Sequence, residues 1–227
     1  VLRALLEALA DRGHADLTLA DGPNVGMERR RIDGFSRLRV DRLARRHGAA
    51  LIDLNRSEGV EVPLVRGTTR VAREVLDAPF LVAVPKLKTH NLGITTLCMK
   101  NLMGTVNVYD RHYCSQAWRE MPEEVRSDPR PRQEWFDRTL HEQYQAGLAR
   151  RLADTAKVVP SHLCIVEGIV GREGTGFRQG RNRALGLAIG GINSVAVDSV
   201  ASYLMGFPPE QLVYLNVAEQ AGLGTNR

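Results

Sequence analysis

A short segment of the sequence gathers side chains that can bind anions and transfer protons. It begins Pro85-Lys86-Leu87-Lys88-Thr89-His90-Asn91, continues through Thr95-Thr96, and ends at Lys100-Asn101. Ammonium groups and amides hold carboxylate or phosphate oxygens, while an imidazole or an amine of lowered pKa moves protons. The expected catalytic side chains are Lys88, His90 and Lys100. The expected substrate-binding side chains of the segment are Lys86, Thr89 and Asn101.

Lys88 and His90 stand two residues apart, so an extended backbone would direct both side chains to the same side. A neighbouring ammonium lowers the pKa of an imidazole, which would keep His90 neutral at pH 7 and able to accept a proton. Lys88 would then hold the oxyanion that develops as the proton leaves. The alternative for the whole segment is a solvated basic loop whose polar side chains cap the next helix.

A second candidate is the glycine-rich run from Gly168 to Gly180, because glycines let the backbone approach a ligand closely or adopt positive φ. The run does not match a dinucleotide-binding fingerprint, since Gln179 stands where the pattern that starts at Gly174 needs a glycine. A long turn between two strands is an equally good interpretation. The residues of this part expected to contact substrate are Glu167, Glu173, Gly174 and Gly176.

The spacing of apolar residues predicts the elements that position these side chains. Helices are expected over residues 1–11, 35–47, 68–76, 133–157, 194–205 and 209–221, and strands over 17–20, 50–54, 80–84, 163–166 and 185–189. Pro85 is expected to end the third of these strands. The alternation predicts an α/β fold with a mainly parallel sheet and helices on both of its faces.

Residues 103–131 contain three prolines among mixed charges and break this alternation, so we expect an irregular insertion or lid there. The chain as a whole, residues 1–227, is expected to form a single α/β domain. Because it starts at Val1 inside a helical pattern, we also expect it to be a trimmed segment of a longer protein.

Ligands of an open parallel sheet bind beyond the carboxyl ends of its strands, where helix amino termini also point. Asp21 and Asn24 follow the first predicted strand and are therefore expected to join the substrate site. We refer to residues 85–101 as the Lys/His segment. By the same rule, this segment and the glycine-rich run should lie beside Asp21 and Asn24 at one edge of the sheet. The sequence thus predicts one composite pocket.

Composition restricts the partners of the chain. The formal charge of +5 and the pI near 9.4 come largely from arginines in 29–31, 37–46 and 126–138, which favours anionic partners. No run approaches the roughly 18 apolar residues that a membrane helix needs, so we expect a cytoplasmic protein with no membrane partner. Aromatic residues make up only 5% of the chain and no nucleic-acid-binding module is recognisable, which argues against a nucleic-acid partner.

The cysteines and histidines argue against a metal site. The three cysteines are widely spaced and lack a C-x-x-C pair, which disfavours disulfides, zinc and iron–sulfur clusters. They are Cys98, Cys114 and Cys164. His141-Glu142 could start a zinc-protease helix, but Gln145 occupies the place of the second histidine.

Asp198 introduces a carboxylate into the apolar helical run from Ala196 to Ala201. We expect it either to pair with a lysine of the Lys/His segment or to face solvent.

Several blocks of the sequence resemble one known family. They are Val84-Pro85-Lys86-Leu87-Lys88-Thr89-His90, Lys100-Asn101-Leu102-Met103-Gly104, Ile165 to Ile169, Gly171 to Gly176, and Ala196 to Gly206. In this order they are similar to the bacterial and archaeal family catalogued as the domain of unknown function numbered 362. Many members of that family carry ferredoxin-like cysteine clusters, which implies redox chemistry for them. The run C-x2-C-x2-C-x3-C is absent here, so no intrinsic iron–sulfur cluster is expected, and any other cofactor is unknown.

Three functions fit these patterns. The leading hypothesis is an enzyme that binds a small oxygen-rich anion on the Lys/His segment and transfers protons, as in an isomerisation, elimination or cyclisation of a biosynthetic pathway. The second is a redox accessory that docks an iron–sulfur or flavin protein through its arginine-rich surface. The third is nucleic-acid binding, for which the basic charge is the motive.

Overall fold

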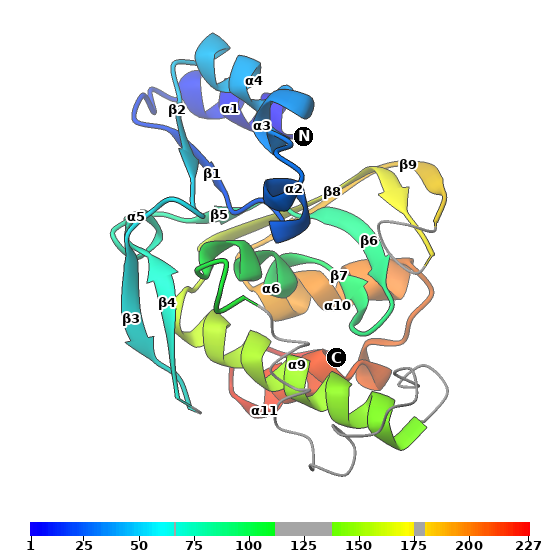
Figure 1. Cartoon of the computed structure of the whole chain (residues 1–227). Helices are drawn as coiled ribbons and strands as arrows, with labels where there is room; N and C mark the ends of the chain where they lie inside the picture. The colour runs from blue at the N-terminus through cyan, green and yellow to red at the C-terminus, as the bar shows by residue number, and fades with distance from the viewer. Residues whose placement is uncertain (66, 112–137, 175–179) are drawn as a thin grey trace. The chain divides into compact units, whose positions relative to one another are not determined.

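The chain divides into two compact units. The structure is a computed structural model that describes residues 1–65, 67–111, 138–174 and 180–227 (Figure 1). The first unit comprises Val1–Ala78 and Met103–Arg111, and the second comprises Pro79–Leu102 and the described residues from 138 onward. Both units combine helices with parallel strand pairs, so the predicted α/β class is confirmed.

The first unit holds a parallel pair of strands and an antiparallel pair. Its elements are α1 (Leu2–Ala10), β1 (Thr18–Asp21), α2 (Val25–Arg29), α3 (Gly34–Arg37), α4 (Val40–Arg46), β2 (Ala50–Asp53), β3 (Gly59–Pro63), β4 (Thr68–Ala72) and α5 (Arg73–Leu76). Strand β1 pairs with β2 in parallel, and β3 pairs with β4 in antiparallel orientation. The predicted first two helix–strand units correspond to α1, β1, α4 and β2.

The helix predicted over residues 35–47 is in fact two short helices. Asp33 caps α3 by accepting hydrogen bonds from the backbone N–H groups of Phe35 and Ser36, at 3.0 and 3.1 Å. Arg39 then adopts a left-handed conformation with φ of 59°, which ends α3 before α4 begins. Each of the two helices has one buried residue, Gly34 in α3 and Ala44 in α4.

The helix predicted over residues 68–76 is also wrong in its first half. Residues Thr68–Ala72 form strand β4, in which Thr69 and Val71 are buried while Thr68 and Arg70 are exposed. This two-residue alternation, carried by β-branched side chains, suits a half-buried strand better than a helix. Only the four residues of α5 are helical.

The second unit contains the larger sheet. Its elements are β5 (Val82–Ala83), β6 (Lys86–His90), β7 (Ile94–Thr96), α6 (Cys98–Asn101), a 3₁₀ turn (Leu102–Thr105) that leads into the first unit, α9 (Arg138–Val158), β8 (Leu163–Arg172), β9 (Asn182–Gly191), α10 (Ser194–Leu204), a 3₁₀ turn (Pro209–Gln211) and α11 (Val213–Gln220). The helices and strands predicted from residue 133 onward correspond to α9, β8, β9, α10 and α11, within the described residues.

Strand β8 is the centre of this sheet. It pairs along its whole length with β9 in antiparallel orientation, so β5 and β6 must share its other edge, where both run parallel to it. Pro85 lies between β5 and β6 and cannot donate a ladder hydrogen bond, although its carbonyl accepts the N–H of Glu167 at 2.8 Å. Strand β5 thus ends before the proline, as predicted, and β6 begins directly after it. The antiparallel hairpins β6–β7 and β8–β9 add to the predicted parallel pairs.

One face of the sheet is packed by helices α6 and α10. The core beneath it contains the side chains of Ala83, Leu87, Leu97, Cys98, Cys164, Val166, Val197 and Ala201. Burial of a leucine such as Leu87 contributes about 2 kcal/mol to folding. Because neighbouring residues of a strand face opposite sides, this burial directs the odd-numbered Leu87 inward and its neighbours outward.

Part of the predicted insertion lies outside the described residues. Of residues 103–131, the structure describes 103–111, which belong to the first unit. Its prediction as a lid, and that of a single domain over 1–227, stay predictions. Among the described helices, none is long and apolar enough to cross a membrane.

Candidate functional site

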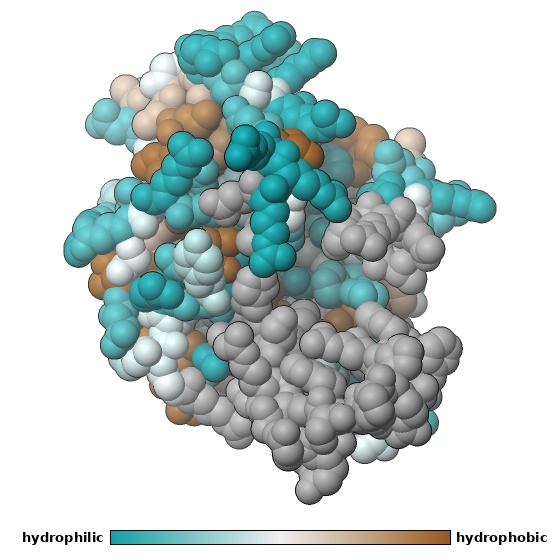
Figure 2. All heavy atoms as spheres, viewed as in Figure 1, coloured by the Kyte–Doolittle hydropathy of each residue, from teal (hydrophilic) through white to brown (hydrophobic). Residues whose placement is uncertain are grey.

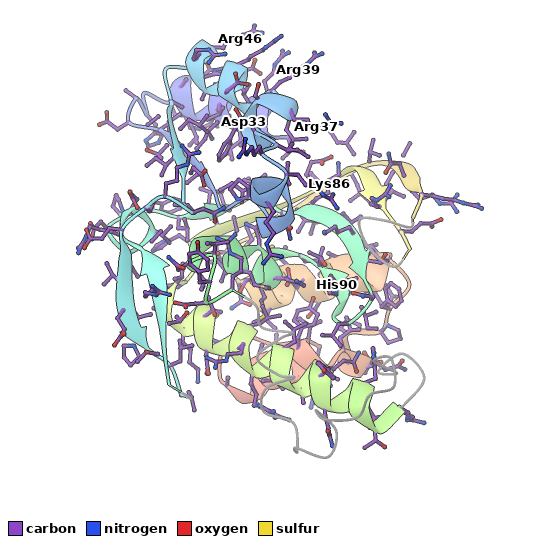
Figure 3. The ribbon with its side chains drawn as sticks, in the orientation of Figure 1. Asp33, Arg37, Arg39, Arg46, Lys86 and His90 are labelled. Atoms are coloured by element: carbon purple, nitrogen blue, oxygen red, sulfur yellow. The ribbon has the colours of Figure 1, made fainter. Side chains whose placement is uncertain are left out.

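The first part of the Lys/His segment is strand β6 (Lys86–His90), in which alternate residues face away from the core. Leu87 packs into the core, and strand alternation puts Lys86, Lys88 and His90 on the opposite face. Figure 3 shows Lys86 and His90 near the two ends of β6. The prediction that Lys88 and His90 lie on one side of an extended segment agrees with this strand.

Lys86 forms an ion pair with Glu167 of the adjacent strand β8. The other carboxylate oxygen of Glu167 accepts the N–H of Ile169 at 2.9 Å, at the irregular point of the β8–β9 ladder. Burial raises the pKa of Glu167, but Lys86 and the backbone donors outweigh burial and hold that pKa below its ordinary value. The ion pair with Glu167 neutralises the charge of Lys86. Lys86 therefore attracts an anion less strongly than the sequence predicts.

Lys88 lies opposite Arg172 in the parallel register of β6 and β8. Its side chain is half-buried, and burial followed by the charge of Arg172 lowers the pKa of the ammonium group. Arg172 itself is held by a 3.0 Å hydrogen bond to the side-chain oxygen of Asn182 on β9. A lysine in this setting is easier to deprotonate than a solvated one.

The imidazole of His90 is fixed by the backbone that follows it. Its Nδ1 accepts hydrogen bonds from the N–H groups of Leu92 and Gly93, at 3.0 and 3.1 Å. Burial, then the charges of Lys100 and Lys88, lower the pKa of His90 to about 3. The ring is therefore neutral near pH 7, and since Nδ1 is an acceptor, its one proton is on Nε2. His90 thus presents a hydrogen-bond donor, whereas the sequence predicted a proton acceptor.

The turn that supplies these two N–H groups is strained. Ile94 has a φ of 64°, and the N–H of Thr95 bonds to the carbonyl of Gly93 at 2.7 Å, which closes a three-residue γ-turn. Positive φ is rare for a β-branched residue and costs of order 1 to 3 kcal/mol. Strain of this kind is found most often at functional sites.

A cavity of about 660 Å³ opens beside His90. Its described lining residues are Thr89, His90, Ile94, Glu173, Gly174, Gly180, Arg181 and Phe207. Thr89 donates a 2.6 Å hydrogen bond to the carbonyl of Gly174, which joins β6 to the glycine-rich run. Glu173 pairs with Arg183 at 2.7 Å. The structure therefore brings together four of the residues predicted for the site: Thr89, His90, Glu173 and Gly174. Lys88 is next to Thr89 on β6 but is not among the described lining residues, and neither are Lys86, Lys100 and Glu167.

Asp198 does neither of the two things expected from the sequence. It is fully buried on α10, and its two carboxylate oxygens accept the N–H groups of Cys98 and Met99 at 2.7 and 3.1 Å. These are the first residues of α6, so Asp198 caps this helix from another element. Because α6 carries Lys100 two residues later, the carboxylate also positions that lysine.

A buried hydroxyl network extends from this cap to the β6–β7 hairpin. The hydroxyl of Thr95 contacts those of Tyr214 and Ser202 at 2.9 and 3.1 Å, and the hydroxyl of Tyr214 donates to Asp198 at 3.5 Å. All four side chains are buried. Helix α10 and helix α11 are thereby connected to the strained turn next to His90.

The burial of Asp198 predicts a pH-dependent stability. Desolvation raises its pKa to about 7 from an ordinary 3.8, against the opposing effect of its backbone donors. The folded chain then binds this proton more tightly than the unfolded chain, so the stabilisation is complete below about pH 4 and is lost as the pH rises through about 7. We expect the free energy of unfolding to fall across this window in denaturant titrations. Asp198→Asn, which has no proton to release, should flatten the decline, and an unchanged slope would contradict this assignment.

The remaining predicted residues are not gathered at β6. Asn101 is the exposed last residue of α6, and Asp21 and Asn24 belong to the first unit. Their contact with substrate stays a prediction. Gly176 lies outside the described residues. Among the residues that the structure does describe, no group of three or more His, Cys, Asp or Glu side chains is placed to hold a metal ion.

Two features of the site went unnoticed in the sequence. The first is the position of Arg172 opposite Lys88. It cannot be read from the sequence because it depends on the register of β6 and β8. The second is the use of lysine: of the 31 lysine and arginine residues only four are lysine, and three of them are Lys86, Lys88 and Lys100. That count could have singled out the segment without a structure.

Comparisons with known proteins agree with the resemblance seen in the sequence blocks. The chain is 27% identical over 154 residues to the thylakoid-associated protein sll1697 of Synechocystis sp., a match that covers 68% of this chain and 41% of that protein. The chain thus spans less than half the length of this relative. No solved structure is significantly similar to it. The family model for the domain of unknown function DUF362 matches residues 1–203, and the chain therefore belongs to the DUF362 family.

Proposed function

We propose that the chain is an enzyme that binds a small oxygen-rich anion beside β6 and transfers a proton on it. The observation that carries this proposal is the state of His90: a half-buried, neutral imidazole, oriented by two backbone donors at Nδ1, next to a lysine whose pKa is lowered. A solvated basic loop would provide neither the orientation nor the lowered pKa values.

The selective use of lysine supports proton transfer over simple anion binding. Arginine is always charged in proteins, whereas lysine loses its proton readily once it is partly buried. The chain uses arginine at almost every other basic position and keeps lysine at three positions of this segment. Anion binding alone would be served as well by arginine.

The proposed roles follow from the proton positions. Lys88, in its neutral form, accepts the proton that leaves a carbon next to a carbonyl or carboxylate. The Nε2–H of His90 donates a hydrogen bond to the oxyanion that develops on the substrate. Lys100 and Arg172 add positive charge near these two side chains, since Lys100 contributes to the lowered pKa of His90 and Arg172 to that of Lys88. Isomerisations, eliminations and cyclisations that pass through an enolate begin with this step.

The cavity suits a small substrate with one anionic end. Arg181 is available to a carboxylate or phosphate, and Phe207 and Ile94 offer apolar contact to the rest of the molecule. Among the described lining residues, the acidic one is Glu173. It forms an ion pair with Arg183, and this pairing limits the repulsion between Glu173 and a bound anion.

Deuterium exchange tests the reaction type before the substrate is known. The protein is incubated in D₂O with a panel of small keto acids, hydroxy acids and dicarboxylates, and deuterium at the carbon next to the carbonyl or carboxylate is followed by NMR. We expect at least one compound that binds in calorimetry to exchange faster than it does without protein. Binding of panel compounds with no exchange in any of them would contradict proton transfer and leave an anion-binding protein.

A further inference from the structure

The first unit carries a concentrated positive charge between residues 28 and 46. This stretch contains eight arginines and three acidic residues, a net charge of +5, which equals the net charge of the whole chain. All eight arginines are exposed. We refer to them as the arginine surface. It lies on α2, α3, α4 and the turns between them, and Figure 3 shows Arg37, Arg39 and Arg46 extending outward from this part of the unit.

Most of this charge is uncompensated. Arg45 pairs with Asp41 at 2.8 Å, and the carboxylate of Asp33 is occupied by the cap of α3. The other seven arginines form no ion pair with any residue that the structure describes. On the face drawn in Figure 2, hydrophilic side chains cover the end of the unit formed by α4.

Exposed apolar side chains lie among these arginines. Leu38 stands between Arg37 and Arg39 and is 73% exposed, and Ile32 is 37% exposed. A leucine this open to water gains free energy when it is buried against another surface. The pattern of guanidinium groups around a protruding leucine is that of proteins which bind an anionic lipid interface.

Two of the arginines occupy positions where glycine would be more stable. Arg31 and Arg39 have φ values of 53° and 59°, each just after the end of a short helix. The N–H of Ile32 bonds to the carbonyl of Met27 at 2.9 Å, the bond that closes a helix at a left-handed residue. Glycine is the usual residue there because it has no Cβ. Arginine at both places indicates that the guanidinium groups serve a purpose other than folding.

We propose that the arginine surface docks the chain onto an anionic membrane surface, with Leu38 entering the interface. A single-stranded nucleic acid fits less well, since its bases bind chiefly by stacking and Phe35, the only aromatic residue of the stretch, is half-buried. A duplex would contact the arginines through its phosphates but would leave the exposed Leu38 without apolar contact. A protein partner also fits less well, because leucine is under-represented and aromatic residues are enriched at interface hot spots. Such peripheral docking requires no helix that spans the membrane, and it departs from the expectation of no membrane partner that the sequence suggested.

Vesicle sedimentation with matched charge variants tests the proposal. The chain should bind vesicles of phosphatidylcholine and phosphatidylglycerol in equal parts, and not vesicles of phosphatidylcholine alone. The triple variant Arg37→Gln, Arg39→Gln, Arg46→Gln should lower the partition coefficient by about 100-fold, because each arginine near a lipid surface contributes roughly a fivefold gain. The control variant Arg3→Gln, Arg12→Gln, Arg56→Gln removes the same charge from exposed arginines elsewhere in the first unit. Equal losses in the two variants would overturn the proposal.

A pair of apolar variants separates lipid from nucleic acid. Leu38→Ser should weaken vesicle binding roughly 10-fold through the lost apolar burial. Val65→Ser is the control, because Val65 is 74% exposed in the same unit but lies outside the arginine surface. If the chain instead binds a duplex oligonucleotide at physiological salt more tightly than it binds the anionic vesicles, the surface is a nucleic-acid site and the proposal fails.

Arg39→Gly tests whether this arginine is retained at the expense of stability. Relief of the left-handed strain should raise Tm by roughly 2 to 4 °C. The same change should weaken vesicle binding about fivefold. A variant that is stabilised and binds vesicles like the parent would contradict the proposed role of Arg39.

Discussion

Lys88→Met is expected to reduce the rate of substrate deuteration by about 100-fold or more, the usual contribution of a general base. Methionine preserves most of the volume and apolar contacts of the lysine stem but cannot accept a proton. Burial of Lys88 and the neighbouring charge of Arg172 lower the pKa of its ammonium group, which makes the neutral amine easier to form than on a solvated lysine. Exchange rates at saturating substrate, measured by NMR in D₂O, report the effect.

Two further lysine variants test whether Lys88 acts as a base or only as a positive charge. Lys88→Arg retains the positive charge but holds its proton, so it should bind the anion and still fail to exchange. Lys157→Met removes the only lysine outside the segment, at an exposed position of α9, and should leave the rate unchanged. If Lys88→Arg exchanges as fast as the parent, Lys88 provides charge and is not the base.

The variants of His90 distinguish a donor from a base. His90→Ala removes the proposed oxyanion donor and should cost about 100-fold or more in rate with binding largely retained. His90→Gln supplies an amide N–H that can donate but has no basic nitrogen at neutral pH. A donor role therefore predicts that His90→Gln is faster than His90→Ala, whereas a base role predicts that both are equally slow.

Asp198→Ala is expected to destabilise the chain by about 3 to 5 kcal/mol, as the removal of buried hydrogen-bonding groups does. The substitution leaves the N–H groups of Cys98 and Met99 without their buried acceptor and deprives Tyr214 of a partner. It also opens a void in a core that is otherwise filled. Urea unfolding followed by circular dichroism, at a pH near 5, gives the free energy directly.

Asp33→Ala is the matched control for this loss. Asp33 also caps a four-residue helix through two backbone N–H groups, but it does so at an exposed position. We expect its removal to cost only about 1 kcal/mol, because water replaces the lost acceptor. Similar losses for Asp33→Ala and Asp198→Ala would show that burial does not strengthen the cap of α6.

The sequence predicts the parts of this molecule that follow local periodicity. Helices such as α1 and α10 and strands such as β1 and β9 show their period directly in the spacing of apolar residues. The same reasoning fails for residues 68–72, where five residues are too few to distinguish a strand from a helical turn. It also fails at Arg39, since an arginine does not signal the left-handed conformation that a glycine would.

The details of the site depend on contacts that no local pattern contains. Lys86 could be recognised as a cation, but its neutralisation by Glu167 requires the pairing of β6 with β8. Asp198 could be recognised as a misplaced carboxylate, but its helix partner lies about 100 residues earlier in the chain. His90 could be identified as a reactive residue, whereas its proton position is set by the strained turn at Ile94.

The protonation state of His90 decides whether its imidazole is the hydrogen-bond donor of the proposed reaction. Spectra of the chain with ¹⁵N-labelled histidine, assigned through His90→Gln, identify which ring nitrogen carries the proton and at what pH the ring titrates. The proposed donor role requires a neutral ring with the proton on Nε2 and an unprotonated Nδ1, unchanged from pH 8 down to about 4, because the pKa is lowered to about 3. A ring that carries its proton on Nδ1, or one that titrates near its ordinary pKa of 6.5, would contradict it.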